Sequence, residues 1–169
     1  MDQFKNIISL VVLLVLLLSL FFSGCFESVG EWGDAPDFTL NTIDGKTFNL
    51  SRQNGKIVVI DFMYVNCRPC QLQMSELKHL YEQFKDEIIM ISVSVWWAED
   101  KTVDLDGFRD YYRAEWMFAI DTPDEDATTK YNAISVPRII IINKNGDISY
   151  TSSGWISYDV LTEEINKSI

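Results

Sequence analysis

The segment VVIDFMYVNCRPC, residues 58–70, is the most informative part of the sequence, because an apolar β-branched run passes directly into two cysteines separated by two residues. The run KIVVIDFMY, 56–64, is typical of a buried strand. Beyond the cysteines, apolar side chains recur at helical spacing and predict an amphipathic helix over about 68–85. A strand that feeds the N-terminus of a helix is typical of an α/β sheet, whose sites lie at the carboxyl ends of its strands.

The rest of the chain continues this alternation. A β-hairpin is predicted within 33–49, around a turn at Asp44-Gly45. The later elements are predicted as strands at 88–95, 116–120, 138–143 and 147–152, and as helices at 105–113, 123–131 and 157–168. The pattern predicts an α/β sandwich with a largely parallel centre and a terminal hairpin.

The N-terminal part of the chain has a different character. An apolar run at 7–22, preceded by Lys5, fits the hydrophobic region of a secretory signal. The FSGC sequence that follows is similar to the lipobox of bacterial-type lipoproteins, in which Cys25 would be lipidated; the alternative is an uncleaved signal anchor. Both place the remainder at the extracytoplasmic face of the cytoplasmic membrane, tethered to it. The predicted division is a signal peptide or membrane anchor at 1–24, a tether at 25–33 and one domain at 34–169.

Composition narrows the class of partner. The formal net charge is −11 and the pI is near 4.4, which argues against binding nucleic acid or an anionic membrane surface through bulk charge. A chain of 169 residues with 47% hydrophobic composition is sufficient for one domain with a proper core. We expect a monomer without a cofactor.

The CRPC pair has four interpretations: haem attachment, zinc binding, a structural disulfide or a redox dithiol. Haem attachment needs a histidine where this chain has Gln71. Zinc needs four ligands, and the other soft candidates are Cys25, in the membrane segment, and His79, which falls off the apolar stripe of its helix. A structural disulfide across two residues closes too small a loop to stabilise much. The pattern favours a redox dithiol and no metal site.

The spacing of the pair suits redox chemistry. Cys67 would begin the helix, where free N–H groups and the helix dipole favour a thiolate. Cys70, one turn later, can resolve the mixed disulfide that Cys67 forms with a substrate. Pro69 fits the first turn, and Arg68 adds a positive charge beside the thiolate.

Several segments together resemble the thioredoxin superfamily, and within it the membrane-tethered TlpA/ResA-like thiol-disulfide oxidoreductases. The resemblance covers about 33–165. GDAPDFTL and DGKTFNLS resemble the N-terminal hairpin of that branch, VVIDFMYVNCRPC the active-site turn, EWMFAID the central insertion, and ISVPRIIIINKNGDI the stretch with the family's cis-proline. The resemblance implies a thioredoxin-like three-layer sandwich with an N-terminal β-hairpin and a central insertion, preceded by a membrane segment.

The resemblance also implies roles for individual residues. Pro137 would be cis and would face Cys67, leaving the backbone of Val136 free to pair with an extended substrate. Asp61, six residues before the first cysteine, matches the buried acid that accepts and returns the proton of Cys70, through water. The alternative is an aspartate that only bonds local N–H groups at a strand end.

Two positions depart from the family pattern. Asn66 stands where tryptophan usually precedes the first cysteine, and Arg138 follows the proline where a small hydroxyl residue is common. Asn66, Arg68 and Pro69, together with Val136, are the predicted substrate contacts. The two arginines form either a local positive rim or two solvent-exposed side chains.

Three more residues keep two interpretations each. Trp96 and Trp97 follow the carboxyl end of a predicted strand, so they either line the substrate groove or pack against the domain. The family branch often carries an acid in its central insertion that assists the cysteines, and Glu115 corresponds to it by position only.

The function that the resemblance implies is reduction of disulfides in protein partners such as apocytochromes c, with electrons from a membrane thiol carrier. One alternative is a thiol peroxidase with antioxidant activity. Its PxxxTxxC pattern requires a proline and a threonine upstream of the cysteine, and this chain has Ile60 and Tyr64 at those positions. Another is a copper-binding metallochaperone, which would prefer CxxxC and a distant histidine. The direction of electron flow does not follow from the sequence.

Overall fold

The computed structural model describes residues 35–169, and its core is one five-stranded sheet with the strand order β5-β4-β3-β6-β7. The strands are β3 (Ile57–Met63), β4 (Ile88–Ser94), β5 (Met117–Ile120), β6 (Arg138–Ile142) and β7 (Ile148–Ser153). Strand β3 runs parallel to β4, as β4 does to β5, whereas β6 is antiparallel to both of its neighbours, β3 and β7. This arrangement confirms the predicted parallel centre and terminal hairpin.

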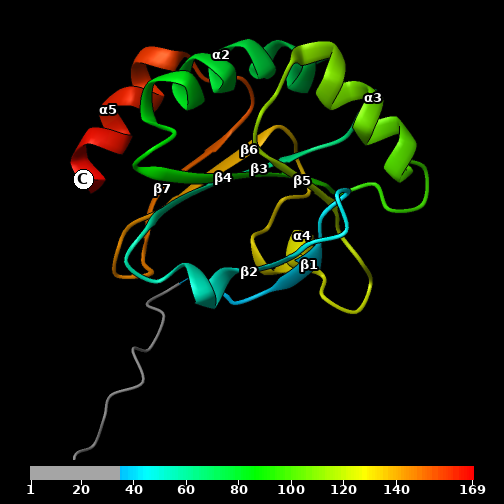
Figure 1. Cartoon of the computed structure of the whole chain (residues 1–169), viewed down its shortest axis with the longest axis horizontal. Coiled ribbons are helices and arrows are strands. Elements are labelled where there is room, and N and C mark those ends of the chain that lie inside the picture. Colours follow the sequence, from blue (N-terminus) through cyan, green and yellow to red (C-terminus); the bar gives the residue numbers. More distant parts are fainter. Residues whose placement is uncertain (1–34) are drawn as a thin grey trace, which may run out of the picture. The chain divides into compact units, whose positions relative to one another are not determined.

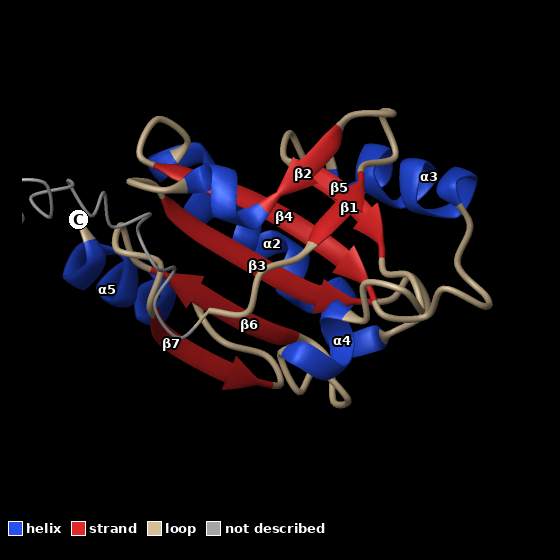
Figure 2. Cartoon of the chain, turned by 90° about the horizontal axis from the view of Figure 1, so that it is seen from below, coloured by secondary structure: helices blue, strands red, loops and turns tan. Residues whose placement is uncertain are grey.

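The sheet separates two layers. Helices α2 (Arg68–Phe84), α3 (Thr102–Tyr112) and α5 (Tyr158–Ser168) cover one face (Figure 1). The other face carries β1 (Thr39–Asn41), β2 (Thr47–Asn49), the 3₁₀ helix η1 (Leu50–Gln53) and α4 (Ala127–Lys130). Figure 2 shows the β1–β2 pair and α4 in front of the central sheet, with α2 behind it. The predicted N-terminal hairpin is therefore present, and the EWMFAID segment contains strand β5.

Strand β3 lies at the centre of both hydrophobic cores. All seven of its residues are buried, because a strand with helices on one face and a hairpin on the other has no solvent side. Ile57, Val59 and Met63 pack with α2, whereas Val58, Ile60 and Phe62 pack with the hairpin layer. Successive side chains of a strand point to opposite faces, and Asp61 lies two residues from Val59 and from Met63, so its side chain is on the same face as theirs, toward α2. This places a polar side chain among apolar neighbours.

Two elements differ from the expectation of the sequence. Helix α3 begins at Thr102, three residues earlier than predicted. The helix predicted at 123–131 is only the single turn α4. It begins late because Asp126 adopts a left-handed conformation, with φ 47°, and caps the helix by accepting a hydrogen bond from the N–H of Thr129.

The predicted N-terminal segments lie outside the described residues, and these include the apolar run at 7–22 and Cys25. Among residues 35–169, no helix is both long enough and apolar enough to cross a membrane.

Candidate active site

The two cysteines lie at the point where β3 passes into α2. Cys67 is the N-cap of α2, and its sulfur forms a disulfide with Cys70. The backbone N–H of Cys70 donates to Sγ of Cys67 over 3.1 Å. Both cysteines are buried, whereas Asn66, Arg68 and Pro69 around them are exposed. The sulfur that would react thus has a hydrogen-bond donor from the helix terminus and polar, accessible neighbours.

The segment before β6 faces this disulfide. The carbonyl oxygen of Val136 lies 4.0 Å from Sγ of Cys67, and the Val136–Pro137 peptide bond is cis. Within residues 35–169, the backbone N–H of Val136 donates to no group. An N–H without a partner, next to a carbonyl that faces the reactive sulfur, can pair with an extended peptide.

Asp61 lies beneath the site on β3. Its side chain is 1% exposed, and Oδ2 accepts a hydrogen bond from the hydroxyl of Ser92 on β4 over 2.9 Å. Oδ1 has no partner among the described residues. Burial raises the pKa of Asp61 from 3.8 to about 7, although the hydrogen bond from Ser92 lowers it. The alternative that Asp61 only bonds local N–H groups finds no such bond here.

The loop before Cys67 is held by two side chains that the sequence did not single out as site residues. The N–H of Val65 donates to Oδ2 of Asp100 over 3.0 Å, and the Val65 carbonyl accepts from the amide of Gln71 over 3.0 Å. Asp100 is itself 4% exposed and accepts from the hydroxyl of Ser94. No pattern in the sequence marked Asp100. Gln71 was considered only as a missing histidine.

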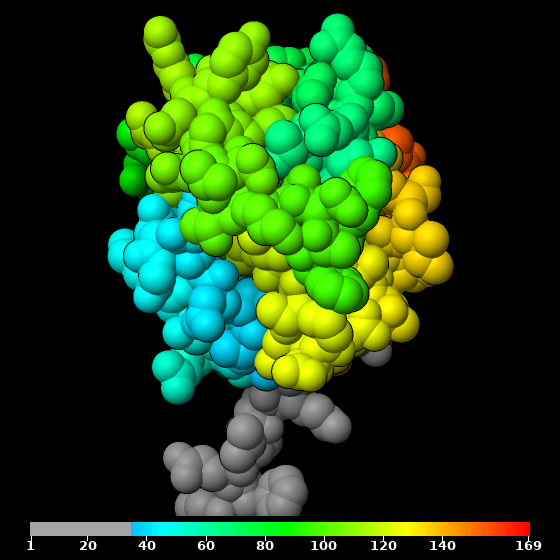
Figure 3. Space-filling view, turned by 90° about the vertical axis from the view of Figure 1, so that its right-hand side faces the viewer, coloured from blue at the N-terminus to red at the C-terminus, as the bar shows by residue number. Residues whose placement is uncertain are grey.

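A groove runs beside the cysteine turn. Its volume is about 330 Å³, and it is lined by Val65, Arg68 and Gln71 on one side and by Phe108, Tyr111 and Tyr112 of α3 on the other. Arg68 lies near enough to Tyr112 to oppose the rise in its pKa that burial causes. Figure 3 views the end of the molecule where β3 and β4 terminate, with the segment near residues 60–70 beside α3.

Arg138 does not form a free positive rim. Its Nε donates to the carbonyl of Tyr131 over 2.8 Å, and Nη1 donates to the hydroxyl of Ser153 over 2.9 Å. These two bonds fasten the residue after Pro137 to neighbouring segments. The guanidinium group of Arg138 is therefore held by hydrogen bonds within the domain and is not a freely exposed positive charge.

The two tryptophans after β4 are both accessible. Trp96 is 44% exposed and stands edge-on to Tyr64, with ring centroids 4.7 Å apart, whereas Trp97 is 54% exposed. Trp96 thus combines packing with an exposed edge next to the cysteine loop. Trp97 has no aromatic partner among the described residues.

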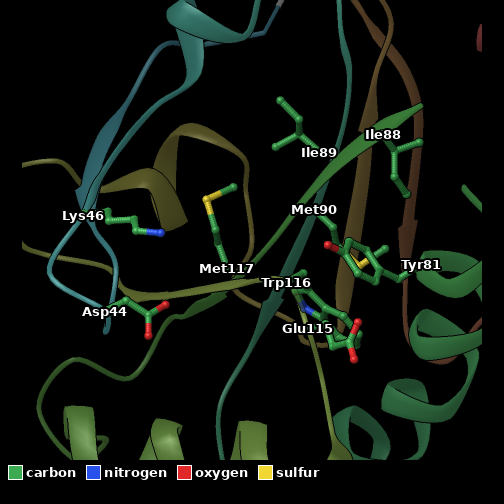
Figure 4. Close-up of a pocket in the computed structure, with 9 residues that line it drawn as sticks. All are labelled: Asp44, Lys46, Tyr81, Ile88, Ile89, Met90, Glu115, Trp116 and Met117. Carbon is green, nitrogen blue, oxygen red and sulfur yellow. The ribbon is translucent and has the colours of Figure 1, made fainter. Parts of the chain in front are cut away.

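Glu115 belongs to another pocket. That pocket has a volume of about 270 Å³, and Figure 4 shows Glu115 in it together with Asp44, Lys46 and Trp116, beside the first residues of β4. Neither cysteine, nor Val136 or Pro137, lines this pocket. The structure does not bring Glu115 to the disulfide. Within residues 35–169, no three His, Cys, Asp or Glu side chains gather in a way that suits a metal ion.

The sequence is similar to one protein family and to individual members of the thioredoxin-like proteins. The AhpC/TSA family model matches residues 33–151. Thioredoxin-like protein YneN of Bacillus subtilis is 26% identical over 138 residues, 82% of this chain and 80% of that protein. Thiol-disulfide oxidoreductase ResA of the same species is 28% identical over 141 residues, 83% and 76% of the two chains. The predicted resemblance to ResA-like proteins is confirmed.

Solved structures share the fold. A thioredoxin-like protein from Aeropyrum pernix superposes with a TM-score of 0.67 at 26% identity, over 78% of this chain and 89% of that one. A thiol:disulfide interchange protein of the thioredoxin family from Chlorobium tepidum has a TM-score of 0.71 at 17% identity, over 80% and 95%. The second likeness shows the fold alone.

Proposed function

Because this chain belongs to the AhpC/TSA family, we propose that it is a thiol-disulfide oxidoreductase that works through the Cys67–Cys70 couple. The observation that carries the proposal is the Cys67–Cys70 disulfide at the N-terminus of α2, 4.0 Å from the carbonyl of Val136. Relatives of 26–28% identity are named as a thioredoxin-like protein and as thiol-disulfide oxidoreductases, which supports it.

The reaction begins from the reduced pair. The thiolate of Cys67 attacks one sulfur of a substrate disulfide, forms a mixed disulfide and releases the first substrate thiolate, which takes up a proton. Asp61 then takes the proton of Cys70, through water. The Cys70 thiolate attacks Sγ of Cys67, closes the Cys67–Cys70 bond and releases the second substrate thiol, which receives that proton. Two electrons pass from the protein dithiol to the substrate.

Each protein group has a physical part in this sequence. The N–H of Cys70 donates to Sγ of Cys67, and together with the positive end of the α2 dipole it stabilises the Cys67 thiolate. Arg68, exposed next to it, adds a positive charge. A pKa of Asp61 near 7 lets this acid both take and return a proton near neutral pH.

The substrate side of the site is formed by residues around the sulfur. The unpaired backbone of Val136, held by Pro137, receives an extended peptide segment on either side of the substrate cysteine. Asn66, Arg68 and Pro69 contact the segment from the cysteine turn, where they are exposed. Trp96 extends the contact surface on the side of Tyr64.

The finer function rests on the sequence. We propose that the protein reduces disulfides in partner proteins such as apocytochromes c and is itself reduced by a membrane thiol carrier. The apolar run at 7–22 supports a tether to the extracytoplasmic face of the membrane, either through lipidated Cys25 or as a signal anchor. The tether and the monomeric state belong to the same proposal.

The test compares two variants that differ only in which sulfur is removed. Cys67→Ser is expected to abolish disulfide exchange with a protein substrate such as insulin. Cys70→Ser is expected to accumulate the mixed disulfide, seen by mass spectrometry and released by thiols. A Cys70→Ser protein that cycles at the wild-type rate would contradict the mechanism.

The reduction potential of the pair decides the direction of electron flow. It is measured by equilibrating the full-length chain in thiol buffers and reading alkylated cysteines by mass. A value near about −270 mV indicates a reductant, whereas one near about −120 mV indicates a disulfide donor and contradicts the proposed role with cytochromes.

A copper(I) titration of the reduced protein tests the metallochaperone alternative. Tight copper(I) binding without any disulfide exchange would contradict the oxidoreductase proposal and favour that alternative.

A further inference from the structure

Asp61 is the end of a chain of hydrogen bonds that joins strands β3 and β4 to the residue before β5. The indole Nε1–H of Trp116 donates to Oγ of Ser92 over 2.9 Å, and Oγ of Ser92 donates to Oδ2 of Asp61 over 2.9 Å. The exposed fractions of the three residues are 5%, 0% and 1%, from Trp116 to Asp61. Asp61 and Ser92 are register partners in the parallel β3–β4 pair, and Trp116 directly precedes β5.

The direction of this chain is set by chemistry. An indole nitrogen donates and cannot accept, so Ser92 must accept from Trp116. A hydroxyl has one hydrogen, and Oδ2 of Asp61 is its only acceptor among the described residues, so a hydroxyl buried at this position satisfies its hydrogen only by donating it to Asp61. Ser92 is therefore held as a donor to Oδ2, whichever protonation state Asp61 adopts.

A fixed donor at one oxygen distinguishes the two oxygens of Asp61. In a protonated carboxyl group the carbonyl oxygen accepts hydrogen bonds far better than the O–H oxygen. The bond from Ser92 thus favours Oδ2 as the carbonyl and Oδ1 as the oxygen that bears the proton. Oδ1 is the atom without a partner among the described residues. Asp61 lies on the face of β3 that packs with α2, which carries Cys70.

We propose that Ser92 and Trp116 are positioning residues that keep the exchangeable proton of Asp61 on Oδ1, on the side available to the cysteines. This inference rests on the proposed function, in which Asp61 exchanges a proton with Cys70. In the resolving step the proton leaves Sγ of Cys70 and joins Oδ1, while Oδ2 remains bonded to Ser92. It leaves again from Oδ1 when the second substrate thiolate is released.

We call the Trp116–Ser92–Asp61 hydrogen bonds the relay. Among the described residues, no charged side chain shifts the pKa of Asp61. The shift in its pKa has two causes, burial and the Ser92 hydrogen bond, and no ionic group of the described residues contributes. The neighbours on β4 and β6 in register with Asp61 are Ser92 and Ile139. At the N-terminus of α2 the titratable groups on this face are Cys67 and Cys70, which the disulfide removes from titration. Tyr81 of α2, Tyr112 of α3 and Tyr158 of α5 also pack against this core, and none of them is a cause of the shift in the pKa of Asp61.

The first experiment reads the protonated carboxyl directly. Infrared difference spectra of the oxidised full-length chain in detergent are recorded between about pH 5 and about pH 9, and the Asp61 band is assigned by its loss in Asp61→Asn. Ser92→Ala is expected to move the carbonyl band to higher frequency, because the carbonyl loses its donor. Trp116→Phe is expected to give a smaller upward displacement, and Ser92→Thr, which keeps the hydroxyl, to restore the wild-type band.

The second experiment reads the chemistry. The mixed disulfide between Cys67 and glutathione is formed, and its resolution is followed against pH. Ser92→Ala raises the pKa of Asp61 further, since the carboxylate loses a donor. A rise of about one pH unit lowers the ionised fraction at pH 7 from about one half to about one tenth, so resolution slows about five-fold.

Ser94→Ala is the matched control. Ser94 is as fully buried as Ser92, stands two residues along the same strand and donates to Asp100 instead. This variant is expected to leave the Asp61 band and the pH inflection in place.

Two failures are distinguishable. If Asp61→Asn resolves the mixed disulfide at the wild-type rate, Asp61 does not exchange a proton with Cys70, and the positioning role of Ser92 and Trp116 is contradicted as well. If Asp61→Asn is slow but Ser92→Ala changes neither the infrared band nor the pH profile, the relay alone is overturned and the oxidoreductase proposal stands.

Discussion

Asp61 and Asp121 are both buried aspartates at strands of the same sheet, yet their surroundings are opposite. Asp121, just after β5, accepts four hydrogen bonds: from the N–H groups of Thr122, Ala127 and Thr128 and from the hydroxyl of Thr128. Asp61, within β3, accepts one, from Ser92, and its other oxygen has no partner among residues 35–169.

The difference separates a structural acid from a functional candidate. A buried carboxylate surrounded by donors holds a segment in place, and Asp121 holds the turn that leads into α4. A buried carboxylate with one donor is costly to ionise and therefore retains a proton near neutral pH. A raised pKa is what the proposed proton transfer between Asp61 and Cys70 requires, and it costs the folded protein stability at high pH.

The strongest test of this comparison is Asp61→Asn. The folded pKa of about 7 lies above the unfolded value of 3.8, so ionisation costs the folded state stability increasingly as pH rises from about 4 to about 7. At pH 8 the free energy of unfolding of the variant should exceed that of wild type by about 4 kcal/mol. Below about pH 4 the two free energies should be equal. Denaturant titrations of the oxidised protein at both pH values measure it. An equal stability difference at the two values would contradict the raised pKa.

Asp121→Asn should have the opposite sign. The amide NH₂ group would face N–H or O–H donors that now bond to a carboxylate oxygen, so unfolding should become easier by about 3 kcal/mol. Exchange activity per folded molecule should remain at the wild-type level. If this variant slowed exchange as much as Asp61→Asn does, the division between the two acids would not hold.

Asp100→Asn sharpens the comparison, because Asp100 is a third buried acid with an intermediate number of donors. Both donors, the N–H of Val65 and the hydroxyl of Ser94, bond to Oδ2, so the carbonyl oxygen of an asparagine can accept both. What is lost is the charge of the acceptor, and we expect a loss of about 1 kcal/mol. Since Val65 lies two residues before Cys67, alkylation of reduced Cys67 should also change in rate. Stability loss with unchanged alkylation would show that Asp100 stabilises the loop without tuning the sulfur.

Much of the site was predictable from local sequence. The buried run 56–64 followed by CRPC indicated a strand, a helix N-terminus and a redox pair, since each depends on neighbours along the chain. Asp61 stood out as one acid in an apolar strand. Pro137 was found through the resemblance to a family, because its isomer does not follow from composition or periodicity.

The residues that were missed act across strands. Ser92 is an unremarkable serine in a buried strand, and Trp116 looks like core packing. Asp100 and Gln71 meet Val65 only because a loop and a helix converge there. Glu115 corresponded in position to an assisting acid, but the structure places it in the pocket beside the start of β4.

The positions of most helices and strands and of the dithiol follow from local sequence, because hydrophobic period, capping and CxxC spacing act within a few residues of the chain. The side chains that adjoin Asp61, by contrast, depend on contacts between segments far apart in the chain. The parallel register of β3 with β4 sets Ser92 beside it, 31 residues away in the chain, and the start of β5 sets Trp116 beside Ser92. Strand register depends on how the whole sheet buries its two faces, and this register leaves one oxygen of Asp61 bonded to Ser92 and the other without a partner among the described residues.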